Sequence, residues 1–129
     1  MDGDNKTKRG KASKDKGARG ERLLSDFLNR HGLNTKRGFV WLNQSDLIDL
    51  DGIHVECKFV ESLNVRKALA QAIEEAEERK DGLPTVFWKK SRKEWVTVMR
   101  TEDWITLYKL ARGNNYDAVR KNFEVHEGE

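Results

Sequence analysis

Residues 45–58 read SDLIDLDGIHVECK, and their alternation of apolar and polar side chains predicts two short strands joined by a tight turn. In a strand, side chains two residues apart share a face. Glu56 and Lys58 are therefore expected on one face, while Cys57 points the other way, into an apolar core. The stretch predicts ionisable groups gathered on the polar face of a hairpin.

The shape of the turn decides which aspartate joins Glu56. A two-residue turn at Asp51 and Gly52 places Asp49 on the Glu56 face, whereas a three-residue loop with Gly52 in a left-handed bulge places Asp46 there. The residue pattern permits both. In either case two carboxylates come within cross-strand reach, which is repulsive unless a cation or Lys58 lies between them. The pattern indicates a metal site.

Two predicted helices add polar candidates. Glu21 lies on the apolar side of a helix predicted over 17–31, where a carboxylate needs a partner. The alternative is that Glu21 complements the helix dipole. Gln71 borders the alanine-rich stripe of a second helix, predicted over 65–80, where it faces either the sheet or water.

Periodicity and turn residues predict the remaining elements. Strands are expected over 39–43, 46–50, 53–60, 84–90 and 94–100, and a third helix over 101–112 with Trp104, Leu107 and Tyr108 inward. A further short helix is expected within 114–129. The order α-β-β-β-α-β-β-α predicts an α/β fold with a mixed sheet flanked by helices.

Length and charge predict a single domain with a basic arm. The chain has 129 residues and a net charge of +3, and residues 1–20 hold seven Lys or Arg against three Asp. Residues 1–16 are predicted to be a flexible basic arm before a domain at 17–129. Such an arm contacts polyanions or serves only as a solubilising tail. Because no apolar run approaches the ~18 residues of a membrane span, we expect a cytoplasmic protein without membrane contact.

The cysteine and histidine content limits the metal chemistry. Cys57 is the single cysteine, so a disulfide within the chain and a cysteine zinc cluster are both excluded. His31, His54 and His126 are scattered without ligand spacing. The sequence therefore favours a metal held by oxygen ligands.

Five residues in order along the chain carry a resemblance to a known family. Glu21 in KGARGERLL, Asp46 in SDL, Glu56 and Lys58 in HVECK, and Gln71 in ALAQA resemble the PD-(D/E)XK nuclease superfamily. Within it, the chain is most similar to the phage and archaeal Holliday junction resolvases, over about residues 17–105. Ser45 stands where the family usually has proline.

The resemblance implies a fold and a mechanism. It implies a restriction-endonuclease-like core, with Asp46 rather than Asp49 as the motif aspartate, which favours the bulged turn. Lys58 is expected to orient a water or stabilise the transition state, and Gln71 to help position it. The implied ligands for one or two Mg²⁺ ions, or Mn²⁺ in their place, are Asp46, Glu56, the Cys57 carbonyl and Glu21.

The resemblance also implies a phosphodiester hydrolase that binds DNA as a homodimer, with a four-way junction as substrate and a phage or prophage origin. The cations expected to contact phosphates are Lys16, Arg19, Arg66, Lys67, Lys89, Lys90, Arg92 and Lys93. For 89–93 the alternative is a solvated hairpin tip. Two other functions stay open, an endonuclease for other branched or duplex DNA and a non-catalytic basic nucleic-acid-binding domain.

Overall fold

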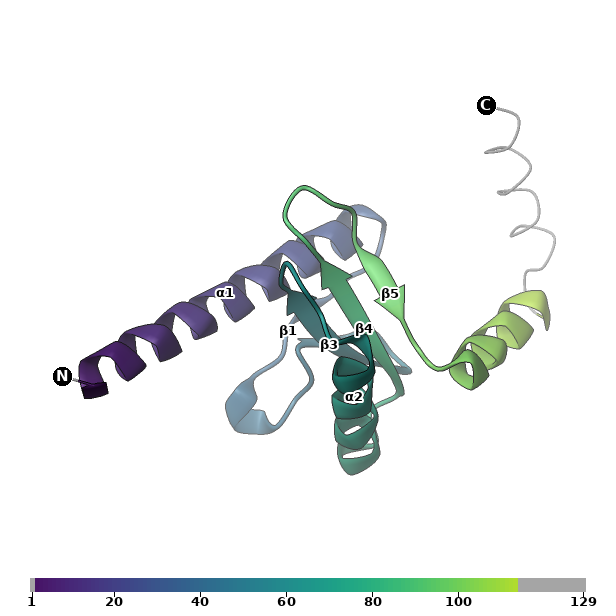
Figure 1. Ribbon diagram of the computed structural model, residues 1–129. Coiled ribbons are helices and arrows are strands. Elements are labelled where there is room, and N and C mark those ends of the chain that lie inside the picture. The colour runs from purple at the N-terminus through teal and green to yellow at the C-terminus, as the bar shows by residue number, and fades with distance from the viewer. Residues whose placement is uncertain (1, 114–129) are drawn as a thin grey trace. The chain divides into compact units, whose positions relative to one another are not determined.

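The structure is a computed structural model that describes residues 2–113, with side chains from residue 15 onward. The chain forms two compact units, Met1–Val98 and Met99–Glu129. Within the described residues the fold is mixed α/β with three helices and a mixed sheet (Figure 1). No helix in that part of the chain is long and apolar enough to cross a membrane.

The first unit is built on a three-stranded sheet in the order β3-β4-β5. β3 (Ile53–Phe59) pairs in parallel with β4 (Leu83–Lys89), and β4 pairs antiparallel with β5 (Val96–Val98). α2 (Val65–Arg79) makes the crossover from β3 to β4. The predicted second hairpin and second helix are thus confirmed.

Two helices cover opposite faces of this sheet (Figure 1). On one face, Leu24 of α1 (Asp2–Arg30) packs in a buried cluster with Val55. On the other face, α2 packs against Val86. Because Glu56 is paired in register with Val86, Glu56 faces α2 and is only 5% exposed. A core therefore lies on both faces of β3, not on one as predicted.

The three strands expected over 39–43, 46–50 and 53–60 do not form one antiparallel sheet. β1 (Lys36–Arg37) and β2 (Leu47–Ile48) pair antiparallel in a separate two-stranded sheet, and β3 takes β4 as its ladder partner. The parallel β3 and β4 pairing buries both faces of β3 between helices, which a surface hairpin cannot do.

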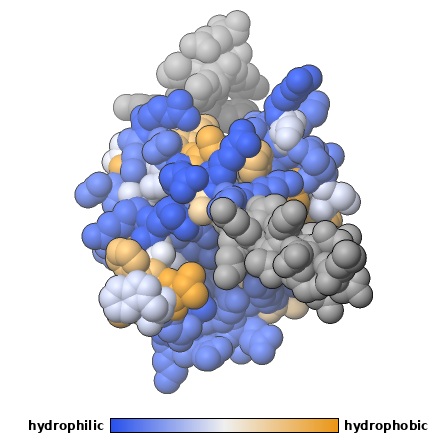
Figure 2. Space-filling view, turned by 90° about the vertical axis from the view of Figure 1, so that its left-hand side faces the viewer, coloured by the Kyte–Doolittle hydropathy of each residue, from blue (hydrophilic) through white to orange (hydrophobic). Residues whose placement is uncertain are grey.

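The strand predicted over 39–43 is also wrong. Residues Val40–Leu42 form a short 3₁₀ helix, η1, closed where Asn43 adopts a left-handed conformation (φ 54°) and donates its N–H to the Val40 carbonyl at 2.9 Å. Val40 is 93% exposed and Trp41 79% exposed, so this apolar run has no sheet to pack on. Figure 2, which views the side where η1 lies, shows an apolar patch bordered by hydrophilic surface.

α1 begins at Asp2, so residues 2–16 form part of a helix where the sequence predicts an arm without fixed structure. The segment contains no proline, and a helix that has already formed in its packed part is extended more easily than a new one is nucleated. The other end lies within one residue of the prediction, because α1 ends at Arg30 and Gly32 follows it with a φ of 93°.

In the second unit, residues 101–113 are helical, as predicted. Arg100 pairs with Asp103 at 2.9 Å across the first turn. Trp104 and Tyr108 stack with their ring centroids 5.3 Å apart, and Trp104 is 53% exposed. The face predicted to point inward is therefore exposed, and its two rings pack on each other one turn apart. The short helix predicted within 114–129 lies outside the described residues.

Candidate functional site

Asp46 lies at the edge of β3 that faces away from β4. The Cys57 N–H donates to Asp46 Oδ2 at 2.7 Å, and the Asp46 N–H donates to the Val55 carbonyl at 3.2 Å. The N–H and carbonyl of one strand residue point to the same edge, so the Cys57 carbonyl also faces this side. Ser45, which precedes Asp46, is buried and donates its hydroxyl to the Leu47 carbonyl at 2.6 Å.

Asp49 lies away from this edge. Its carboxylate pairs with Lys36 Nζ at 3.4 Å and its side chain is 54% exposed. The turn itself has two residues, since the Ile53 N–H donates to the Leu50 carbonyl at 3.1 Å. The prediction of a bulge at Gly52, which was expected to bring Asp46 to the Glu56 face, is therefore wrong. Instead, Asp49 has a φ of 65°, which interrupts the strand and breaks the alternation between the turn and Asp46.

Glu56, Lys58 and Gln71 meet where β3 and α2 face each other. Lys58 Nζ lies 3.3 Å from Glu56 Oε1 and donates to Gln71 Oε1 at 3.3 Å. Gln71 Nε2 in turn donates to Glu75 Oε1 at 3.2 Å. The predicted lysine and glutamine are therefore joined in one chain of polar contacts that begins at the buried carboxylate.

Glu21 reaches the same region from α1. Its carboxylate accepts a hydrogen bond from Arg37 Nε at 2.8 Å, and its negative charge contributes to raising the pKa of Asp46. The helix comes close because the preceding residue is Gly20. A Cβ at that position would lie 2.7 Å from the Cβ of Phe59 on β3.

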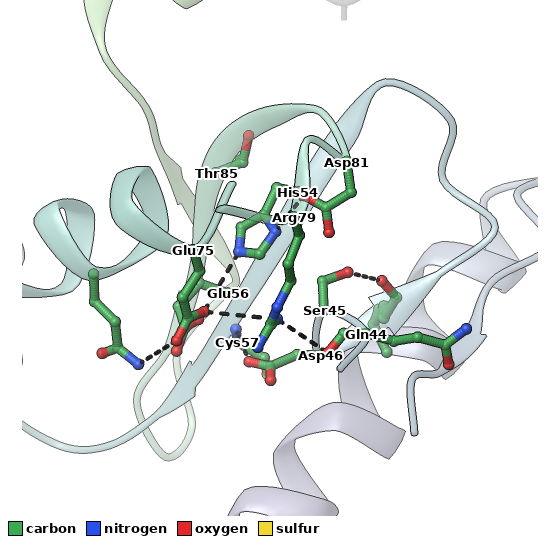
Figure 3. Close-up of polar contacts among 12 residues, drawn as sticks. Gln44, Ser45, Asp46, His54, Glu56, Cys57, Glu75, Arg79, Asp81 and Thr85 are labelled. Carbon is green, nitrogen blue, oxygen red and sulfur yellow. Dashed lines mark hydrogen bonds and ion pairs between the residues drawn. The ribbon is translucent and has the colours of Figure 1, made fainter. Parts of the chain in front are cut away.

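Four residues that sequence reasoning did not assign to the site also lie there. His54 is fully buried, with Nδ1 2.8 Å from Asp81 Oδ1 and Nε2 3.5 Å from Glu75 Oε2 (Figure 3). Arg79 Nη1 lies 3.9 Å from Glu75 Oε2 and donates to the Gln44 carbonyl at 3.0 Å. One ligand atom each from His54, Glu56 and Glu75 lies within 4.8 Å of the others.

Two spacings in the sequence contain the signal for these residues. His54 precedes Glu56 by two residues, so the two share a face of β3. Gln71, Glu75 and Arg79 recur every four residues along one face of α2. The histidines lack ligand spacing along the chain, but the crossover brings His54 beside Glu75 in space.

Burial dominates the electrostatics of the two central carboxyl groups. It raises the pKa of Glu56 to about 8, with further contributions from the charge of Asp46 and from Glu75. It also raises the pKa of Asp46 to about 6, although the Cys57 N–H opposes the shift. Burial acts on Glu75 in the same direction, but hydrogen bonds from Glu56 and Gln71 outweigh it and lower the pKa of Glu75. Without a cation, Glu56 therefore holds a proton that it donates to Glu75.

The thiol of Cys57 is not suited to nucleophilic chemistry. Burial, with the negative charges of Asp46 and Glu21, raises the pKa of this thiol far above its usual range. Its side chain packs against the core cluster of Leu24 and Val55. Cys57 can act at the site only through its backbone.

The balance of charge fits a bound divalent cation. Five carboxylates line the site, and among the described residues the cationic side chains paired with them are three, Arg37, Lys58 and Arg79. An excess of buried carboxylates is unfavourable unless a cation or a proton compensates it. Carboxylate and carbonyl oxygens are the ligands that Mg²⁺ and Mn²⁺ prefer, so the donor set around Asp46 fits these ions.

A cluster of cations surrounds Phe59, the residue that follows Lys58. The charged groups of Lys16, Arg19 and Lys89 lie 5.9, 5.7 and 5.7 Å from the centroid of its ring. We call these three cations with Phe59 the Phe59 cluster. Beside it, at the end of β4, Nζ of Lys90 lies 5.6 Å from the ring centroid of Trp88 on that strand. The predicted DNA-contacting residues of α1 and β4 therefore meet next to the site.

The other predicted cations lie on exposed surface. Arg66 and Lys67 are in the first turn of α2, and Arg92 and Lys93 are in the loop between β4 and β5. A pocket of about 220 Å³ is lined by Lys58, Lys67 and Gln71 among others, so one of these surface cations borders the site directly.

A scan against protein-family models finds no match to the chain, and a search of curated proteins also returns none. The nuclease resemblance therefore stays a prediction from the motif residues.

Proposed function

We propose that this protein is a metal-dependent endonuclease that hydrolyses phosphodiester bonds in DNA, with the four-way junction as its substrate. The observation that carries the proposal is the proximity of Asp46, at the free edge of β3, to Glu56 and Lys58 on the face of β3 toward α2, since the charges of Glu56 and Lys58 interact with that of Asp46. The proposal includes a restriction-endonuclease-like core, with the element order that the sequence predicts.

The residues that would hold Mg²⁺ or Mn²⁺ are Asp46, Glu56, the Cys57 carbonyl and Glu21. Such an ion supplies a water of lowered pKa and neutralises charge on the scissile phosphate. Lys58 then donates from Nζ to the attacking water or to a phosphate oxygen, where negative charge develops. Gln71 holds that ammonium group in place through its 3.3 Å hydrogen bond.

The DNA backbone would follow the cations around the site. The Phe59 cluster and Lys90 offer positive charge on one side of Lys58, and the pocket lined by Lys67 offers it on the other. These are contacts to phosphates, which position DNA without reading its sequence. They suit a substrate recognised by shape.

We also propose a twofold homodimer, because two symmetric sites match the near symmetry of a four-way junction. The exposed apolar side chains of η1 are the surface that a second copy would cover, with Val40 93% and Trp41 79% exposed. Light scattering of the full chain measures this directly. A Trp41→Asp variant should shift a dimer toward monomer.

Cleavage of a synthetic four-way junction in Mg²⁺, beside a matched duplex and a flap, tests the function. We expect symmetric nicks in the junction alone. Equal cutting of all three substrates would show a general endonuclease. Binding without any cutting would show a non-catalytic nucleic-acid-binding domain.

Two substitutions at the site test the assigned roles. Glu56→Gln and Lys58→Ala should each lower the cleavage rate by about 10²–10³-fold or more, because each removes a group that acts on the transition state. Junction binding should remain close to that of the unaltered chain. Glu74→Gln, an exposed change on α2, is the matched control and should cut normally. Full activity in both site variants would refute the assignment.

A further inference from the structure

We infer that His54, Glu56 and Glu75 form a second metal position, which takes a transition-series ion such as Zn²⁺ through one ring nitrogen and two carboxylates. The inference goes beyond the proposed function, because occupancy of this position requires neither DNA nor cleavage. It also differs from the set around Asp46, which offers oxygen ligands alone.

The three side chains come from facing elements and converge in a small volume. His54 and Glu56 lie on the same face of β3, and Glu75 projects from α2 toward them (Figure 3). One ligand atom from each lies within 4.8 Å of the others. His54 is fully buried, while the side chain of Glu75 is 26% exposed. An ion would therefore enter past Glu75.

The orientation of His54 is the independent sign of a ligand. Nδ1 lies 2.8 Å from Asp81 Oδ1, and since an ionised carboxylate only accepts, Nδ1 carries the proton and donates it. In the neutral ring, Nε2 then presents a bare lone pair. This buried atom points toward Glu75 and has no hydrogen-bond partner among the described residues.

A carboxylate behind one ring nitrogen and a metal on the other is the usual way in which proteins orient a histidine ligand. Here Asp81 is the carboxylate at Nδ1 and acts as a positioning residue. Glu56 and Glu75 face the other ring nitrogen, Nε2, where the metal would bind. Two carboxylates and a lone pair repel one another unless a cation or a proton lies between them.

The neighbouring cations do not fill this place. Lys58 Nζ reaches Glu56 Oε1 at 3.3 Å and extends on toward Gln71. Arg79 Nη1 stays 3.9 Å from Glu75 and is engaged by the Gln44 carbonyl. A ring nitrogen favours Zn²⁺ over Mg²⁺, so the position should select Zn²⁺ by ligand type. Because Glu56 belongs to both sets, ions at the two positions would share its carboxylate.

Nitrogen-15 NMR of the histidine rings tests the inference. The full chain is stripped of metal with a chelator and titrated with Zn²⁺ or Mg²⁺ alone. With Zn²⁺ we expect a large shift of the His54 Nε2 signal while Nδ1 stays protonated, and with Mg²⁺ no such shift. Glu75→Gln should weaken Zn²⁺ binding by about 10–100-fold, whereas Glu74→Gln should leave it unchanged.

Two behaviours of the His54 ring in the unaltered chain would overturn the inference. One is a His54 ring that does not respond to excess Zn²⁺. The other is a ring that keeps protons on both nitrogens throughout the titration, as an imidazolium held between Asp81 and Glu75. Asp46→Asn should leave the His54 response intact; its loss there, with retention in Glu75→Gln, would assign the ion to the Asp46 set. None of these measurements depends on DNA cleavage, so their failure is distinguishable from a failure of the proposed nuclease function.

Discussion

Glu56 is a carboxyl group that the fold buries and then surrounds with other carboxyl groups. In the folded, metal-free chain the pKa of Glu56 is raised to about 8 and that of Asp46 to about 6, from ordinary values of 4.5 and 3.8. At a pH between the ordinary and the raised pKa of each group, the folded chain holds a proton on that carboxyl group, whereas the unfolded chain has lost it. Stability must therefore fall as pH rises through this range.

We expect the metal-free chain to lose on the order of a few kcal/mol of unfolding free energy between about pH 4 and about pH 8. Urea denaturation in the presence of a chelator measures this loss. Glu56→Gln should remove most of the pH dependence, and added Mn²⁺ should reduce it by replacing the protons. Greater stability at the upper pH in the metal-free chain would contradict the prediction.

Of the two aspartates before the turn, we expect Asp46 to be needed for cleavage and Asp49 not to be needed. Asp46 contacts the Cys57 N–H, whereas Asp49 pairs with Lys36 on exposed surface. Asp46→Asn should lower metal-dependent cleavage by about 10²-fold or more, since it removes a charged ligand. Asp49→Asn should cut at nearly the normal rate, because asparagine also tolerates a left-handed backbone. Loss of activity in Asp49→Asn alone would reverse this assignment.

At the scale of elements, the approach of α1 to β3 positions Glu21. Gly20→Ala brings a Cβ to 2.7 Å from Phe59, so we expect a loss of about 1–3 kcal/mol in stability and a lower cleavage rate as the helix moves outward. Gly17→Ala, three residues earlier in the same helix, meets no atom within 4 Å among the described residues. It should stabilise the chain by up to ~1 kcal/mol.

Thermal or urea unfolding of both alanine variants, with cleavage rates measured in parallel, gives the comparison. Helix propensity acts equally at the two positions, so the difference between them isolates the contact with Phe59. Equal stability in Gly20→Ala and Gly17→Ala would mean that α1 does not pack closely on β3.

The sequence predicts elements whose patterns are local. α2 and the β4 and β5 hairpin follow from periodicity and from Asn64, which caps α2 by accepting from the Lys67 N–H. The run at 39–43 misleads because its apolar residues are exposed, so strand propensity has no surface to act on. The parallel pairing of β3 with β4 joins segments separated by a whole helix, which no local pattern encodes.

For the site residues too, the sequence predicts the contacts that follow from local patterns and misses those that depend on long-range pairing. The contact of Lys58 with Glu56 follows from strand alternation, whereas the choice of Asp46 rests on family resemblance because turn chemistry alone permits two registers. The left-handed backbone of Asp49, which decides the register, has no signal in residue type beyond the tolerance of aspartate for that conformation. The partnership of His54 with Glu75 depends on the crossover, so it becomes visible only in three dimensions.

At the scale of the molecule, the basic surface should make DNA binding dependent on salt. Each phosphate contact that is lost lowers the slope of log affinity against log salt concentration by about one, because one fewer counterion is released on binding. Replacing both Lys89 and Lys90 by alanine should therefore reduce the slope of log affinity against log salt by about 2. Arg30→Ala is the control, since helix rise places it about 16 Å from Arg19 along α1. Equal slopes in both variants would exclude β4 from the DNA path.

The contacts that define the site join residues close together in the chain. Their separations are 11 residues for Cys57 and Asp46, 13 for Lys58 and Gln71, 16 for Arg37 and Glu21, and 27 for His54 and Asp81. Closing short loops costs little entropy, and proteins rich in near contacts fold quickly. The site should thus assemble early in refolding. In pulsed hydrogen exchange, the Cys57 amide should gain protection together with the β3 and β4 ladder, and later protection would contradict this.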